Sequence, residues 1–186
     1  EGNATDSTAA QFNTINEATT IAIDASEVTA LASSDLSDVK TLLTAANDTD
    51  QFTDSTGKVS FGDLTAVTIA DATINVSDFN AAVTQANTAT GKTTAADGGG
   101  ATVFTLTNVA TYSGGTAADF ATLITNEGKS LIDGGITDEA LTVDSTGTIS
   151  VSEVNTLNST TTGVVTATIT EGDMTTLADL ADKEGG

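Results

Sequence analysis

Two segments of the chain, 53–63 and 143–153, carry oxygen side chains at offsets that suit a calcium ion. Each contains Asp-Ser-Thr-Gly, an aliphatic residue two positions after the glycine, and a carboxylate at its end. The calcium loop of EF-hands likewise combines oxygen ligands, a glycine at the sharp turn and a terminal acid. The candidate metal ligands are therefore Asp54 and Asp63 in the first segment, and Asp144 and Glu153 in the second.

A simpler interpretation of the same segments stays open. The position that should carry the first aspartate of a calcium loop holds Phe52 in one copy and Thr142 in the other. A β-turn at Ser-Thr-Gly between two short strands explains these residues without a metal. If a metal is bound, we expect calcium or magnesium, because the chain has neither cysteine nor histidine to offer as a softer ligand.

The overall charge excludes several classes of partner. The chain has 186 residues, with 26 acidic side chains against 5 lysines, and a formal net charge of -21. Binding to nucleic acid requires cations that displace counterions from phosphate, so we expect no nucleic-acid partner. No apolar stretch approaches the roughly 18 residues of a membrane span, and we expect none.

The composition also argues against an enzyme. Cysteine, histidine, tryptophan, proline and arginine are absent, so there is no Ser-His or Cys-His nucleophile and no arginine clamp. Paired carboxylates alone could serve a glycosidase, but such sites usually add aromatic platforms for the sugar. With one tyrosine and six phenylalanines, this chain offers few of them, and we predict no catalytic residues.

A short pattern recurs along the chain, at 21–28, 59–64, 74–79 and 149–154. Apolar residues alternate, and a serine or glycine followed by an acid comes next. Alternation at period two predicts a strand with one buried face, while the serine or glycine with its acid predicts a helix N-cap and a negative first turn. Apolar residues at helical spacing then predict a short helix, which must pack against the strands to be stable.

Repetition of this unit predicts an α/β solenoid, with stacked short parallel strands and short helices or turns. We interpret 1–186 as a single solenoid-like domain with sub-repeats at approximately 1–52, 53–135 and 136–186. A second similarity relates 12–21 to 154–164, and it places an asparagine after an apolar residue at Asn13, Asn80 and Asn155. Stacked coils would align these side chains in a ladder or against turn backbone; three separately solvated asparagines are the alternative.

Three segments, 12–16, 23–31 and 155–165, carry a family resemblance. They resemble the threonine- and aspartate-rich tandem repeats of very large surface proteins in marine cyanobacteria and related bacteria. The resemblance covers the two ends of the chain, whereas 88–135 departs from it. It implies a secreted or cell-surface protein with a structural or adhesive role, and it implies no catalytic residues.

Taken together, these observations predict a structural repeat segment that acts as a spacer, filament element or adhesive stalk. Open ends of a solenoid expose strand edges and apolar core, so the expected partners are other copies of the chain or adjacent repeats. The alternative is a calcium-dependent adhesion or binding module whose ligands are the four candidate acids.

Overall fold

The computed structural model describes residues 7–20, 23–47, 61, 63–90, 101–144 and 148–181. Helices and strands alternate along this part of the chain. The helices are α1 (Ala9–Ala18), α2 (Leu36–Asn47), α3 (Val76–Thr90), α4 (Ala117–Gly128), α5 (Val151–Thr160) and α6 (Met174–Leu177). The strands are β1 (Ala30–Ser34), β2 (Ala66–Ile69), β3 (Thr73–Asn75), β4 (Val103–Leu106), β5 (Thr111–Gly115), β6 (Ile132–Asp133), β7 (Ala140–Val143), β8 (Thr148–Ile149), β9 (Val165–Thr166) and β10 (Thr168–Ile169).

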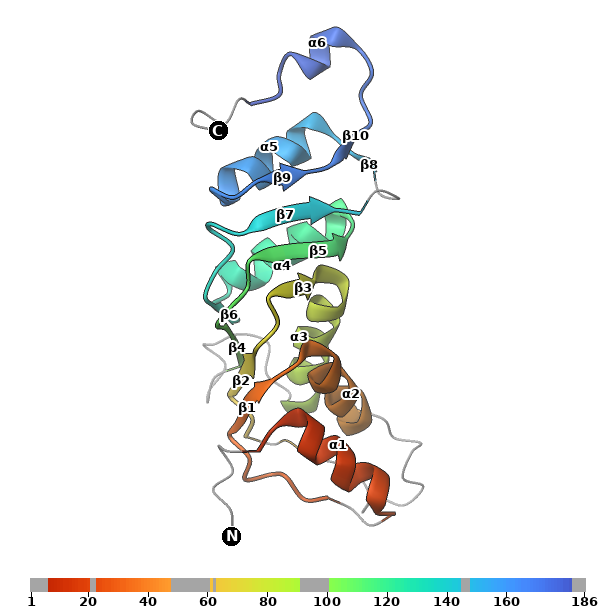
Figure 1. Cartoon of the computed structure of the whole chain (residues 1–186), viewed down its shortest axis with the longest axis vertical. Coiled ribbons are helices and arrows are strands. Elements are labelled where there is room, and N and C mark those ends of the chain that lie inside the picture. Colours follow the sequence, from red (N-terminus) through yellow and green to blue (C-terminus); the bar gives the residue numbers. More distant parts are fainter. Residues whose placement is uncertain are drawn as a thin grey trace.

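The strands form two four-stranded sheets and one strand pair, and every pairing in them is parallel. One sheet has the order β1-β2-β4-β6, the other has the order β3-β5-β7-β9, and β8 pairs with β10. Figure 1 shows the strands stacked along the long axis of the molecule, with the first helix near one end and the last helix near the other. The expected mixed α/β architecture with parallel strands is confirmed.

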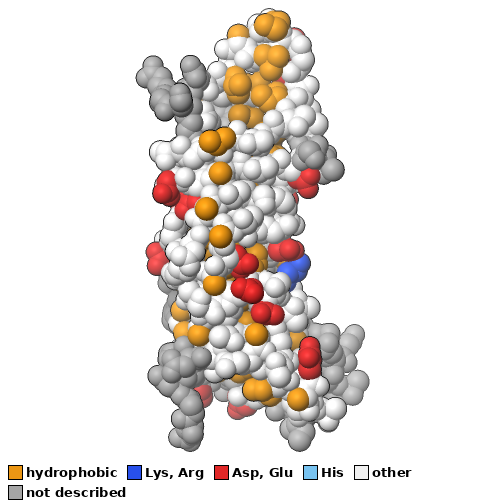
Figure 2. Space-filling model, viewed as in Figure 1, with side chains coloured by type: hydrophobic (Ala, Val, Ile, Leu, Met, Phe, Trp, Pro, Cys, Tyr) orange, Lys and Arg blue, Asp and Glu red, His pale blue; other side chains and the backbone are white. Residues whose placement is uncertain are grey.

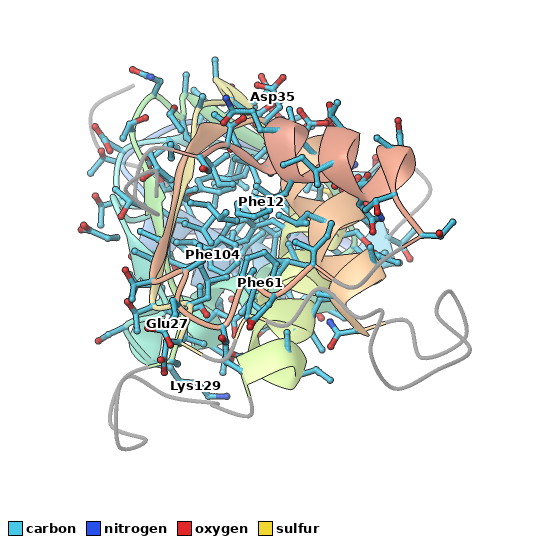
Figure 3. The ribbon with its side chains drawn as sticks, turned by 90° about the horizontal axis from the view of Figure 1, so that it is seen from below. Phe12, Glu27, Asp35, Phe61, Phe104 and Lys129 are labelled. Carbon is cyan, nitrogen blue, oxygen red and sulfur yellow. The ribbon has the colours of Figure 1, made fainter. Side chains whose placement is uncertain are left out.

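The strand register places apolar side chains in inward-facing columns. In one sheet Val67 lies between Leu31 and Phe104, and all three are at least 98% buried. In the other, Ile74, Tyr112 and Leu141 are paired in the same way and are fully buried, as period-two alternation predicts. Viewed along the long axis, Phe12, Phe61 and Phe104 point into the interior, whereas Asp35, Glu27 and Lys129 lie at the rim (Figure 3).

The helices form a second layer in which each packs on the next, from α1 through to α5. Aromatic contacts join this layer to the sheets: the rings of Phe79 in α3 and Phe104 in β4 meet edge to face at 5.4 Å. Helix α3 runs for 15 residues, longer than the short helix that the sequence pattern predicts. Its buried face continues through Ala82, Val83 and Ala86, and this apolar contact sustains the extra turn.

The expected N-caps are displaced by two residues where the pattern does begin a helix. In the copies at 74–79 and 149–154 the pattern predicts N-caps at Ser77 and Ser152, but both residues lie inside the first helical turn. Helix α5 is capped by Ser150, whose hydroxyl accepts from the backbone N–H of Glu153. The acid therefore occupies the third helical position, where its carboxylate reaches back to the cap backbone, as in a capping box. The predicted negative charge in the first turn is confirmed.

Two copies of the pattern lead into strands, so the helices predicted directly after them are wrong. After Ser26 the chain makes a turn and enters β1, and after Leu64 it enters β2. At the first site the backbone N–H of Ser26 donates to Asp24 Oδ1 at 3.0 Å. This local bond offers the backbone an alternative to the first helical turn. Within the described residues, none of the helices is both long and apolar enough to cross a membrane.

Candidate functional site

The structure describes three of the four predicted calcium ligands. Asp54 lies outside the described residues, and Asp63 is an exposed residue shortly before β2. Asp144 directly follows β7, and its backbone N–H donates to the carbonyl of Gly115 at 2.9 Å. In the described ranges, no three acidic side chains come together in a group that could hold a metal ion. The calcium site therefore stays a prediction.

Glu153 already has a structural role. Its Oε2 accepts hydrogen bonds from the backbone N–H of Ser150 at 2.8 Å and from the hydroxyl of Ser150 at 2.7 Å. These bonds, the backbone one first, lower the pKa of the Glu153 carboxyl below its ordinary value. Asp173 is instead the N-cap residue of α6, where its carboxylate accepts from the N–H of Thr176 and this bond lowers its pKa. Part of the acidic charge thus stabilises helix starts.

The three asparagines singled out in the sequence all connect one layer of the stack to the next. Asn13 donates to the backbone carbonyl of Asp38 at 3.0 Å, and Asn80 donates to that of Asp119 at 2.8 Å. Asn155 donates to the carbonyl of Asp179 at 2.9 Å. The alternative of separately solvated side chains is therefore wrong. The asparagines satisfy the backbone of the following segment, rather than bonding to one another in a ladder.

These bridges obey a simple positional rule. Asn13, Asn80 and Asn155 each occupy the fifth position of their helix. In the first two cases the acceptor is the third residue of the next helix. Helix α2 has Lys40 at its fifth position, and this lysine forms an ion pair with Asp78, the third residue of α3. The fifth position of one helix and the third position of the next are thus joined either by a hydrogen bond from a side-chain amide to a backbone carbonyl or by an ion pair.

The fifth position of α4 holds Ala121, which is exposed and can make no such bond. A different asparagine, Asn126, donates to Asn80 Oδ1 at 3.3 Å, which adds a second bond between α4 and α3 and does not join α4 to α5. Asn47 likewise donates to the carbonyl of Gln85 at 2.9 Å and ties α2 to α3. The sequence pattern pointed to neither residue, because Asn126 follows Thr125, and Asn47 follows the small Ala46 rather than a large apolar residue as the other three do.

A buried acid, Glu139, lies between β6 and β7, and this feature was missed in the sequence. Glu139 is 8% exposed, and burial raises the pKa of its carboxyl. Nearby, the hydroxyl of Tyr112 donates to the carbonyl of Gly135 at 2.9 Å. Burial, and then the charges of Glu139 and Glu127, raise the pKa of this phenol. The arrangement favours protonated groups, and only the folded structure brings these residues together.

The C-terminal end carries an exposed apolar patch, which we define as Val164, Met174 and Leu180. Their exposed fractions are 71%, 81% and 40%. Figure 2 shows hydrophobic side chains gathered at this end, while most of the visible face is uncharged and polar. Elsewhere in the described residues Ile15, in α1, is the other large apolar side chain that is exposed, at 51%. Exposed apolar side chains gathered at one end make this end a candidate interaction surface.

Comparison of the chain with protein-family models, with curated proteins and with solved structures gives no match. Function is therefore argued from the stacked strands, the bridges between helices and the apolar end.

Proposed function

We propose that the chain is an α/β solenoid segment with a structural function in a secreted or cell-surface protein, where it acts as a spacer, filament element or adhesive stalk. The observation that carries the proposal is the way the strands stack. Both four-stranded sheets add their strands in a single direction along the molecule, and the helix layer follows the same order. Such stacking builds length, and each layer needs only its neighbours for its core.

The side chains between the layers support this proposal. Apolar columns run through the strands, and polar bridges such as Asn80 to Asp119 run through the helices. The apolar contacts repeat from layer to layer, and polar bridges join α1 to α2, α2 to α3, α3 to α4, and α5 to the segment that follows it. The formal charge of -21 gives a surface that stays soluble in a salty medium, which suits an extracellular location.

Small-angle X-ray scattering tests the proposed shape. A compact domain of this length has a radius of gyration of about 16 Å. A solenoid segment should exceed this value and give a pair-distance distribution with one short-distance maximum and a long tail. A symmetric distribution with a radius near the compact value would contradict the proposal.

A further inference from the structure

We propose that the two ends of the molecule form a head-to-tail contact, in which the C-terminal apolar patch of one copy packs against α1 of a second copy. The inference rests on the proposed structural function and names the partner that such a segment would take. Its first basis is the incomplete core at the C-terminal end. Val165 of β9 belongs to the same inward column as Ile74, Tyr112 and Leu141, yet it is only partly buried, whereas those three are fully buried.

The backbone is also open at this end. Strand β9 is the last strand of its sheet and pairs only with β7 in the described structure. Its outer edge therefore presents backbone groups that can pair with another strand. Met174 and Leu180 follow this strand in the sequence and add exposed apolar surface. The C-terminal end thus presents an open strand edge and exposed apolar side chains, which are the two kinds of surface that a further layer would contact.

The second basis is a comparison of two equivalent positions within the chain. The sequence Asn13-Thr14-Ile15-Asn16 corresponds to Asn155-Thr156-Leu157-Asn158, and the first asparagine of each forms the same type of bridge. Leu157 is only 3% exposed, but Ile15 is 51% exposed. Helix α5 packs on α4, whereas α1 has no described helix before it. Ile15 therefore occupies a position that becomes buried when a preceding layer is present.

The geometry favours a second copy placed head to tail. A two-fold contact between two C-terminal ends would pair β9 with β9 in antiparallel fashion, unlike every strand pairing in the sheets, and would leave Ile15 exposed. A head-to-tail contact continues the parallel stacking and covers both ends. Because that contact joins different surfaces and continues the stack along one axis, each added copy presents a new free end, and linear oligomers result.

Electrostatics should oppose the contact and make it depend on salt. Helix α1 carries Glu17, and the C-terminal end carries Glu171, Asp173 and Asp179. Salt screens the repulsion between these exposed carboxylates over about 10 Å at 0.1 M. We therefore expect self-association to strengthen as salt is added.

Sedimentation velocity over a range of protein and salt concentrations tests the proposal with two end variants. Ile15→Glu places a charge on the first end, and Met174→Glu places one on the second. Each change should weaken self-association by at least about tenfold, because an unpaired charge would be buried in the contact. Thr122→Glu is the matched control: it adds the same charge on an exposed part of α4, between the two ends, and should associate like the unmodified chain. Circular dichroism checks that all variants fold.

Mixing the two end variants distinguishes the possible contacts. A head-to-tail contact leaves one intact surface on each variant, so the mixture should form dimers that grow no further. If Ile15→Glu associates as well as the unmodified chain, the contact is a symmetric one between C-terminal ends and the proposal is overturned. If the unmodified chain is monomeric at all salt concentrations, the second copy is not the partner. The proposed structural function would survive both results, because the scattering test of shape is independent of them.

Discussion

The side-chain amide of Asn80 donates to the backbone carbonyl of Asp119 at 2.8 Å, across 39 positions of sequence. Asn80 is 8% exposed, and its Oδ1 also accepts from Asn126. One side chain thus satisfies a carbonyl in the first turn of α4 and an amide near the end of the same helix. Because buried polar groups are costly when unpaired, this residue fixes how α3 and α4 sit against each other.

Replacement of Asn80 by alanine should therefore destabilise the chain. The change leaves the carbonyl of Asp119 and the amide of Asn126 without their partner, and we expect a loss of about 1–3 kcal/mol. Urea denaturation would measure the free energy of unfolding. Asn108→Ala is the control, since Asn108 is exposed and bonds only its neighbour Thr107. Equal stability of the two variants would contradict the bridging role.

The positional rule for the bridges also predicts a substitution that stabilises the chain. Ala121 occupies the fifth position of α4, and the third position of α5 is Glu153. Ala121→Asn should allow a new bond to the backbone carbonyl of Glu153 and stabilise the chain by about 0.5–1 kcal/mol. Thermal melting compared with Ala121→Gln, whose longer amide is displaced by one carbon, would check the result. A loss of stability specific to the asparagine variant would show that the rule does not extend to α4.

Glu139 should make stability depend on pH. Its pKa is raised above the ordinary value of 4.5, so the folded state favours the neutral acid and is penalised when the group ionises. The stabilising effect is complete below the unfolded pKa and is lost as pH rises through the folded one. Glu139→Gln removes the titration, so the variant should gain stability over the unmodified chain as pH rises. Melting curves at acid and neutral pH measure the difference in stability between Glu139→Gln and the unmodified chain. A difference that does not change with pH would rule the effect out.

Gly163 should not tolerate a side chain. A Cβ atom built at this position would lie 2.1 Å from the carbonyl oxygen of Glu139, which belongs to the backbone and cannot simply rotate away. Gly163→Ala should therefore cost about 1–3 kcal/mol through overpacking. Gly172→Ala is a matched control, because its Cβ would meet nothing within 4 Å. Both variants can be compared in the same thermal melts; similar midpoints would show that the chain relaxes around Gly163.

Calcium should have little effect on the thermal stability of the chain if the function is purely structural. Glu153 is bonded to Ser150, and the acids of the described residues do not gather in threes. We expect superimposable thermal melts in calcium and in chelator. A midpoint that rises by many degrees with calcium would instead favour the calcium-dependent adhesion module. Asp144→Asn would then test the proposed ligand set directly, because the calcium effect should shrink in that variant.

Local signals in the sequence predicted the kinds of element well and their boundaries poorly. Alternation identified Ile74 as an inward-facing strand residue, and the acid in the first helical turn identified Glu153. The cap itself lay two residues earlier, because a capping box places the acid at the third helical position. Ser26 and its acid were followed by a strand, since the Asp24 side chain holds the backbone in a turn. The same local pattern is compatible with a helix start and with a turn into a strand, and tertiary packing selects between them.

The sequence by itself determined the mixed α/β class of the fold and the acidic surface, and it singled out three asparagines as candidates for contacts between layers. These features depend on side-chain chemistry and on short-range spacing, both of which can be read along the chain. Only the tertiary structure decided the acceptors of those asparagines, the burial of Glu139, and the difference between exposed Ile15 and buried Leu157. Each of these depends on which layer lies next to the residue. Neighbours in the stack come from strand pairs 20 or more residues apart, such as Thr148 with Thr168, and short-range spacing does not specify them.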